Sequence, residues 1–182
     1  NPKTNPVTKK FVLALPFLLS LLLNGQNFDA IITELAVQHE AEIIELRHWF
    51  HQNAELSNRE FKTAEKISAA LTKIGLVPKT GVAKTGVVAV LNGGKPGPVV
   101  ALRADIDGLP VKERADLPWK SNMVGEYNGE KVPVMHACGH DTHTAMLLGV
   151  AKILCAIKDD IPGSIKFIFQ PAEEGAPAGE EG

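Results

Sequence analysis

Apolar residues recur every three or four positions in the first long segment after residue 26, which places them on one side of an α-helix. Those positions are Ile31, Ile32, Leu35, Ile43, Leu46 and Phe50. We expect this helix to end near Asn53. A second stretch repeats the pattern with one apolar stripe of Phe61, Ile67, Leu71 and Ile74. Asn58 is a possible cap for this second helix, and Gly75 is expected to end it.

The period of the pattern changes after residue 85. Short Val-rich runs over 86–91 and 98–104 are typical of strands, and a Gly- and Pro-rich turn separates them. A third helix is predicted over 141–157, and a third strand follows it and ends at Pro171. Helices that alternate with apolar strands predict a layered α/β domain, whose functional site should lie at the ends of the strands.

The N-terminal segment differs from the rest of the chain. Lys9 and Lys10 precede an uncharged apolar run over 11–23. A membrane span needs about 20 such residues, so the run fits the apolar region of a signal peptide better. We therefore expect residues 1–25 to be a signal peptide and the protein to be exported. A buried helix or a short membrane anchor stays open, because the following "LNGQ" is a poor cleavage site.

Composition excludes several classes of protein. The 182 residues are 45% hydrophobic and 22% charged, as in a soluble globular domain. The formal net charge is −2, and no basic cluster is interleaved with aromatic residues, which argues against a nucleic-acid partner. The two cysteines cannot form a disulfide framework, and Cys155 is expected to be an ordinary core residue.

The segment "HACGH" contains the first candidate for chemistry. In an extended chain Cys138 and His140 point to the same side, and Gly139 between them lets the backbone fold around an ion. Thiolate and imidazole suit zinc and other late divalent metals. The alternative is a solvated loop that also contains His136, beside a buried cysteine.

Two glutamates form a second candidate group. Glu173 and Glu174 follow the apolar strand that Pro171 closes, so they should lie at the mouth of the sheet. Metal-dependent hydrolysis needs one carboxylate to bind the ion and another that stays free to take a proton from water. Two exposed glutamates in a charged loop are the alternative interpretation.

Three aspartates could support such a site. Asp105 and Asp107 follow a Val-rich strand two positions apart, so they share a side, and such carboxylates commonly orient ligating histidines. An ordinary turn with two solvated aspartates is the alternative. Asp141 could act in the same way or cap the helix that follows. His143 is expected on the surface or in a capping turn, and not as a metal ligand.

Five motifs in succession resemble one enzyme family. They are "ELRHWFHQNAELSNRE", "TGVVAVL", "PGPVVALRADIDGLPVKE", "MHACGHDTHTAMLLGVAKIL" and "IKFIFQPAEEGAPAGEEG". Together they resemble the aminoacylase and carboxypeptidase-like metallopeptidases. The most similar branch is that of the amidohydrolases, which includes hippurate hydrolase, N-acyl-amino-acid amidohydrolases and the plant auxin-conjugate hydrolases. The resemblance covers 45–182, with Ala54 where the family usually has proline.

The resemblance implies a function and a role for several residues. Cys138, His140 and Glu174 match the family's metal ligands, and Glu173 matches its general base. Asp105 and Asp107 fall beside the metal site. The implied activity is hydrolysis of the amide bond of N-acyl amino acids or small peptides, with two divalent ions, zinc or manganese.

The family's architecture also sets expectations for the chain as a whole. Residues 26–182 would be the N-terminal part of a catalytic domain with a helix–sheet–helix, zinc-peptidase-like fold that is incomplete at its C-terminus. The remaining ligands and a lid domain, which often makes a homodimer, would lie beyond Gly182. Two alternatives stay open: a non-catalytic fragment that binds metal, and a thiol hydrolase with Cys138 as nucleophile and His136 or His140 as its base.

Overall fold

The computed structural model describes residues 28–175, so the predicted signal peptide lies outside the described residues. The chain forms two units, Asn1–Glu34 and Leu35–Gly182. The described part of the first unit, 28–34, is helical. None of the helices in the described part of the chain combines the length and the apolar character that a membrane crossing requires.

Three α-helices confirm the helical periods of the sequence. They are α2 (Phe28–Gln52), α3 (Phe61–Lys73) and α4 (His140–Ala156). Gly75 adopts a φ of +86° just after α3. Its amide donates to the Thr72 carbonyl, and the next amide donates to Leu71. This left-handed residue ends the helix as predicted.

The predicted start of α3 is wrong in two respects. Asn58 is not its cap: this residue is buried with a φ of 62°, and Glu60 occupies the cap position without a capping side-chain bond. The Glu55 carboxylate accepts the amides of Lys62 and Thr63 instead. Phe61 does not share the buried stripe, since it is 60% exposed.

The main sheet has four strands in the order β1-β2-β6-β3. Their bounds are β1 (Lys79–Val82), β2 (Gly86–Asn92), β6 (Pro162–Gln170) and β3 (Lys95–Asp105). β6 lies between the two Val-rich strands, antiparallel to β2 and parallel to β3. Because β3 and β6 are parallel, their carboxyl ends meet at the same edge of the sheet.

A hairpin that the sequence patterns did not predict completes the strands. It consists of β4 (Met123–Tyr127) and β5 (Glu130–Val134). Its turn uses positive φ at Asn128 and Gly129, as a two-residue hairpin turn requires. The hairpin packs on a small apolar cluster that includes Ala54, the residue at the family's usual proline position.

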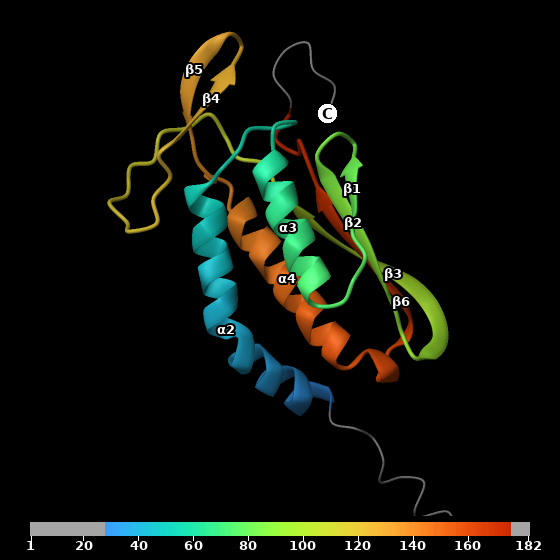
Figure 1. The fold of residues 1–182 in the computed structure, drawn as a ribbon. Coiled ribbons are helices and arrows are strands. Elements are labelled where there is room, and N and C mark those ends of the chain that lie inside the picture. The colour runs from blue at the N-terminus through green and yellow to red at the C-terminus, as the bar shows by residue number, and fades with distance from the viewer. Residues whose placement is uncertain (1–27, 176–182) are drawn as a thin grey trace, which may run out of the picture. The chain divides into compact units, whose positions relative to one another are not determined.

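Figure 1 shows α3 and α4 lying over one face of the main sheet. The side chains of β2 and β6 alternate accordingly, and the buried ones are Val87, Ala89, Leu91, Phe167 and Phe169. Burying each of the two phenylalanines stabilises the fold by about 1.5–3 kcal/mol. Within residues 35–175, Figure 1 shows no α-helix on the opposite face, where Val90 is 45% exposed. The α/β class is confirmed.

Candidate metal site

Three segments meet at the carboxyl edge of the sheet. β3 ends at Asp105, which pairs with Gln170 at the end of β6, and α4 begins nearby with His140. Gly139 caps α4 with a φ of +91°, a conformation that other residues rarely adopt. This turn places His140 inside the fold, while Cys138 remains exposed.

His140 is buried and held through one of its two ring nitrogens. Its Nδ1 lies 3.0 Å from the main-chain oxygen of Asp107. A carbonyl oxygen can only accept, so Nδ1 carries the hydrogen and Nε2 is left to bind something else. Nε2 lies 3.6 Å from Glu173 Oε2 and 3.8 Å from Glu174 Oε1.

The separations around Nε2 fit ligands of a shared ion better than direct hydrogen bonds. Two ligand atoms that each lie about 2.1 Å from a tetrahedral zinc are roughly 3.4 Å apart. Cys138, His140 and Glu174 each offer a ligand atom, and these atoms lie within 4.8 Å of one another. Glu174 Oε1 is also buried without a hydrogen-bond partner in the described part of the chain, which a cation would supply. The donor set therefore fits a divalent metal.

The electrostatics around Cys138 argue against a nucleophilic thiolate. Hydrogen bonding to the Glu174 carboxylate, with further repulsion from Glu173 and Asp105, raises the pKa of the Cys138 thiol. The thiolate is the form that acts either as nucleophile or as metal ligand, and it needs a pKa lowered by nearby positive charge, such as that of a bound cation.

The two aspartates after β3 lie in different surroundings. Asp107 is buried, and its Oδ2 accepts hydrogen bonds from the Ser57 hydroxyl and from the Glu174 amide. Its main-chain oxygen also contacts His140, so Asp107 links that ring to the segment that follows β6. Asp105 is partly exposed, and Arg103 donates to its Oδ1 over 2.8 Å.

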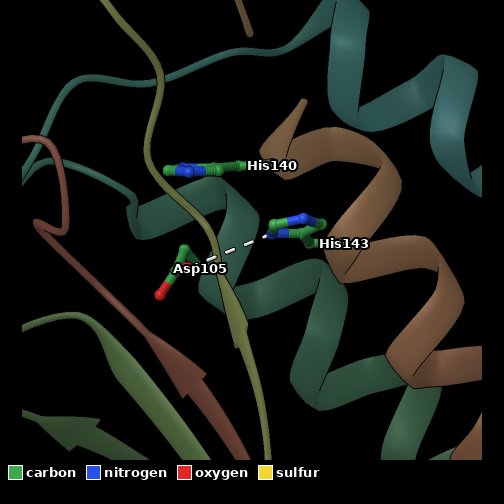
Figure 2. Close-up of side chains that lie close together, drawn as sticks. All are labelled: Asp105, His140 and His143. Atoms are coloured by element: carbon green, nitrogen blue, oxygen red, sulfur yellow. Dashed lines mark ion pairs between the residues drawn. The ribbon is translucent and has the colours of Figure 1, made fainter. Parts of the chain in front are cut away.

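Asp105 also faces His143, as Figure 2 shows. Its Oδ2 lies 4.0 Å from His143 Nδ1. The pair and His140 form a second group whose potential ligand atoms lie within 4.8 Å of one another. His143 is half exposed, as a surface residue was expected to be, but it lies at the site. The i, i+3 spacing from His140 on a helix was the signal for this.

Asp141 does not cap α4, because Gly139 occupies that position. Its buried Oδ2 instead lies 2.9 Å from His51 Nδ1 and 2.9 Å from Arg47 Nε. Burial alone would raise the pKa of Asp141, but the bond from His51 and the charges around it lower the pKa overall. Asp141 thus anchors α2 to α4 one residue after His140.

Two further buried groups near the site were not predicted. His51 Nε2 lies 2.7 Å from Glu113 Oε2, so both ring nitrogens of His51 face carboxylates. The hydrogen bond to Asp141, followed by that to Glu113, raises the pKa of His51. Glu60 is fully buried at the start of α3. These partners are distant in the sequence, so local patterns gave no signal for them.

Comparison with known proteins shows which family this chain resembles. Residues 101–182 match the sequence model of peptidase family M20/M25/M40. The chain is also 50% identical over 133 residues to thermostable carboxypeptidase 2 of Saccharolobus solfataricus, covering 72% of this chain and 32% of that protein. The chain is thus similar in sequence to peptidase family M20/M25/M40.

Further proteins match the chain in sequence or in fold. An N-acyl-L-amino acid amidohydrolase of Geobacillus stearothermophilus is 44% identical over 150 residues, covering 82% of this chain and 38% of that protein. The crystal structure of the YXEP protein of Bacillus subtilis, described as a dinuclear metal-binding peptidase of the M20 family, superposes with a TM-score of 0.65 at 39% identity. That match covers 80% of this chain and 36% of the other. The chain thus spans about a third of the length of the relatives it matches.

Proposed function

We propose that this chain carries the metal ligands and the general base of a metal-dependent amidohydrolase. Its substrates would be N-acyl amino acids or small peptides, cleaved at the amide bond. The observation that supports this most directly is the convergence of Cys138, His140 and Glu174, with the Glu173 carboxylate 3.6 Å from the same imidazole.

The named relatives support this substrate class. Carboxypeptidases, N-acyl-L-amino acid amidohydrolases and an N-acetyl-L-cysteine deacetylase of Bacillus subtilis all take their names from the cleavage of a bond between a carbonyl carbon and nitrogen. The likeness to a dinuclear peptidase supports two ions, which we propose to be zinc or manganese.

Each residue has a distinct task in this proposal. Cys138, His140 and Glu174 would hold the metal, while the Asp107 carbonyl fixes the ring of His140. Bound divalent ions supply Lewis-acid chemistry, polarising a water molecule and the amide carbonyl. Glu173 is 40% exposed at its side chain, so one of its oxygens can take a proton from water and then deliver it to the leaving amine.

The first test replaces the proposed base in the whole protein. Glu173→Gln keeps the shape of the side chain and removes its ability to accept a proton, so turnover of N-acetyl and N-benzoyl amino acids should fall by about 10²–10⁴-fold. Metal content, measured by elemental analysis, should stay unchanged. Glu130→Gln on the exposed β5 strand is the matched control. A Glu173→Gln enzyme with near-normal turnover would exclude this role.

The same assay separates the alternatives. If the Cys138 thiol were the nucleophile, a thiol reagent would abolish turnover and a metal chelator would not. If the chain bound metal without catalysis, it would hold stoichiometric metal and hydrolyse none of the substrates. Cys138→Ser should weaken metal binding, whereas Cys155→Ser, which alters the partly buried cysteine of α4, should leave it unchanged.

Export and dimerisation are separate proposals. Lys9, Lys10 and the apolar run over 11–23 support export, and sequencing the N-terminus of the secreted protein would test it. A mature N-terminus near residue 26 is the expected result. Homodimerisation of the whole protein rests on the family resemblance, and its molar mass in solution would test it.

A further inference from the structure

The Glu60 carboxylate is buried where no proposed catalytic role uses it. The residue is 0% exposed, and burial raises its pKa, which its hydrogen bonds only partly offset. A buried carboxylate is unfavourable unless polar partners surround it. Glu60 holds the cap position of α3, but its side chain makes no capping bond, because Glu55 accepts the first amides of that helix.

Both oxygens of Glu60 bind other parts of the fold. Oε1 accepts the amide of Ala172 over 2.9 Å, and Oε2 accepts the hydroxyl of buried Thr85 over 2.5 Å. Thr85 lies between β1 and β2, whereas Ala172 follows the end of β6. One side chain therefore connects the start of α3, the β1–β2 connection and the segment that carries the two glutamates of the site.

The segment after β6 needs such a connection. The ladder of β6 ends at Gln170, and Ala172 has a φ of 53°. A left-handed conformation is unfavourable for a residue other than glycine, so neighbouring contacts must maintain it. Two residues later, the amide of Glu174 donates to Asp107 Oδ2 over 3.0 Å. Buried carboxylates thus hold the main chain on both sides of Glu173.

We infer that Glu60 is a positioning residue: it holds the amide of Ala172 and thereby fixes the turn that aims Glu173 and Glu174 at His140. The consequence for metal binding rests on the proposed function. The bond from Glu60 to the Ala172 amide is independent of that function, because it fixes the main chain whether or not a metal binds.

The test uses the whole protein and variants of Glu60. Glu60→Met keeps the length of the side chain and removes both acceptors without leaving an unpaired charge. Glu60→Gln can still accept from Ala172 with its amide oxygen while its NH₂ donates to the Thr85 hydroxyl. Glu55→Ala is the matched control, because it loosens the same end of α3 without touching the turn.

Two measurements are made on each variant. Hydrogen exchange followed by NMR reports the Ala172 amide, and we expect it to exchange about 10–100-fold faster in Glu60→Met than in the wild type. Titration with Co²⁺, read from the thiolate-to-cobalt absorption of Cys138, reports the metal site. We expect Co²⁺ affinity to fall about 10–100-fold in Glu60→Met. Glu60→Gln and Glu55→Ala should stay near wild type in both measurements.

Several results would overturn the inference. These are unchanged exchange at Ala172 in Glu60→Met, unchanged Co²⁺ affinity despite faster exchange, and an equal loss of affinity in Glu55→Ala, which would indicate general destabilisation. If Glu60→Met does not fold, Glu60→Ala is measured in its place. A wild-type chain that binds no Co²⁺ would contradict the proposed metal site, while amide exchange would still decide whether Glu60 holds the turn.

Discussion

Two buried histidines near the site have opposite surroundings. His51 and His136 are each 5% exposed. Both ring nitrogens of His51 lie within hydrogen-bond distance of carboxylates, whereas neither nitrogen of His136 has a hydrogen-bond partner in the described part of the chain. Hydrogen bonding to Asp141 raises the pKa of His51, and desolvation lowers the pKa of His136 to about 4. The carboxylates beside His51 favour its charged form, whereas no hydrogen bond offsets the burial of His136.

His140 lies between these extremes and shows what a ligand position needs. One nitrogen is fixed by the Asp107 carbonyl, and the other faces the glutamates at 3.6 and 3.8 Å without a direct bond. Fixing one nitrogen orients the ring and selects the tautomer, and leaving the other open creates a place for an ion. The same residue type thus occurs between two carboxylates, without a hydrogen-bond partner among the described residues, and as a candidate ligand.

Of the changes to these histidine environments, removing the Asp141 carboxylate that His51 and Arg47 share should lower stability most. Asp141→Ala removes the buried carboxylate that His51 and Arg47 share and leaves His51 with Glu113 alone, so the free energy of unfolding should fall by about 3–5 kcal/mol. Urea denaturation at pH 7 measures it. Asp116→Ala, which removes an exposed ion pair with Lys120, is the control and should show no measurable change. Equal free energies of unfolding in the two variants would mean that the bonds from Asp141 to His51 and Arg47 contribute little to stability.

Much of the fold could be predicted from local patterns, because the relevant signals lie within a few residues of one another. The long helices and the strands β2, β3 and β6 follow from apolar periodicity. The connection after β1 could not be predicted, since its positive φ angles fall on Ala83 and Lys84, which are not typical turn residues. The β4–β5 hairpin differs, because Asn128-Gly129 is a recognisable hairpin signal that apolar periodicity alone does not contain.

The residues of the site also divide into those with a local signal in the sequence and those without one. Cys138 and His140 are two residues apart and Glu173 and Glu174 are adjacent, so local spacing identified them as candidates. The supports are remote in sequence: His51 meets Asp141 across 90 positions, and Glu60 meets Ala172 across 112. Only the folded chain brings such pairs together. Asp141 shows the limit clearly, because its position at a helix start indicated a cap while its actual partners lie on another helix.

The second prediction tests His136 in acid. Its pKa of about 4 in the folded chain lies below the usual 6.5, so the unfolded chain binds more protons between these values. Stability should therefore fall by about 3 kcal/mol as the pH drops from 6.5 to 4. His136→Leu should lose this share of the acid sensitivity, measured by urea denaturation across that range. His39→Gln, on the N-terminal helix, is the control. An unchanged acid slope in His136→Leu would show that this histidine is not buried in the neutral form.

The third and smallest effect concerns His51 in alkali. Its pKa is raised in the folded chain, so its ion pairs stabilise fully below pH 6.5, the unfolded value, and are lost as the pH rises through the folded value. The Arg47–Asp141 pair persists in this range, which limits the loss. Both thiols are present in all three proteins compared, so their titration contributes equally to the three curves. The free energy of unfolding should therefore decline over this range in the wild type and in His39→Gln, but less in His51→Gln. Parallel curves for all three proteins would mean that His51 does not carry the charge that its two carboxylates indicate, and the contrast with His136 would then reduce to geometry alone.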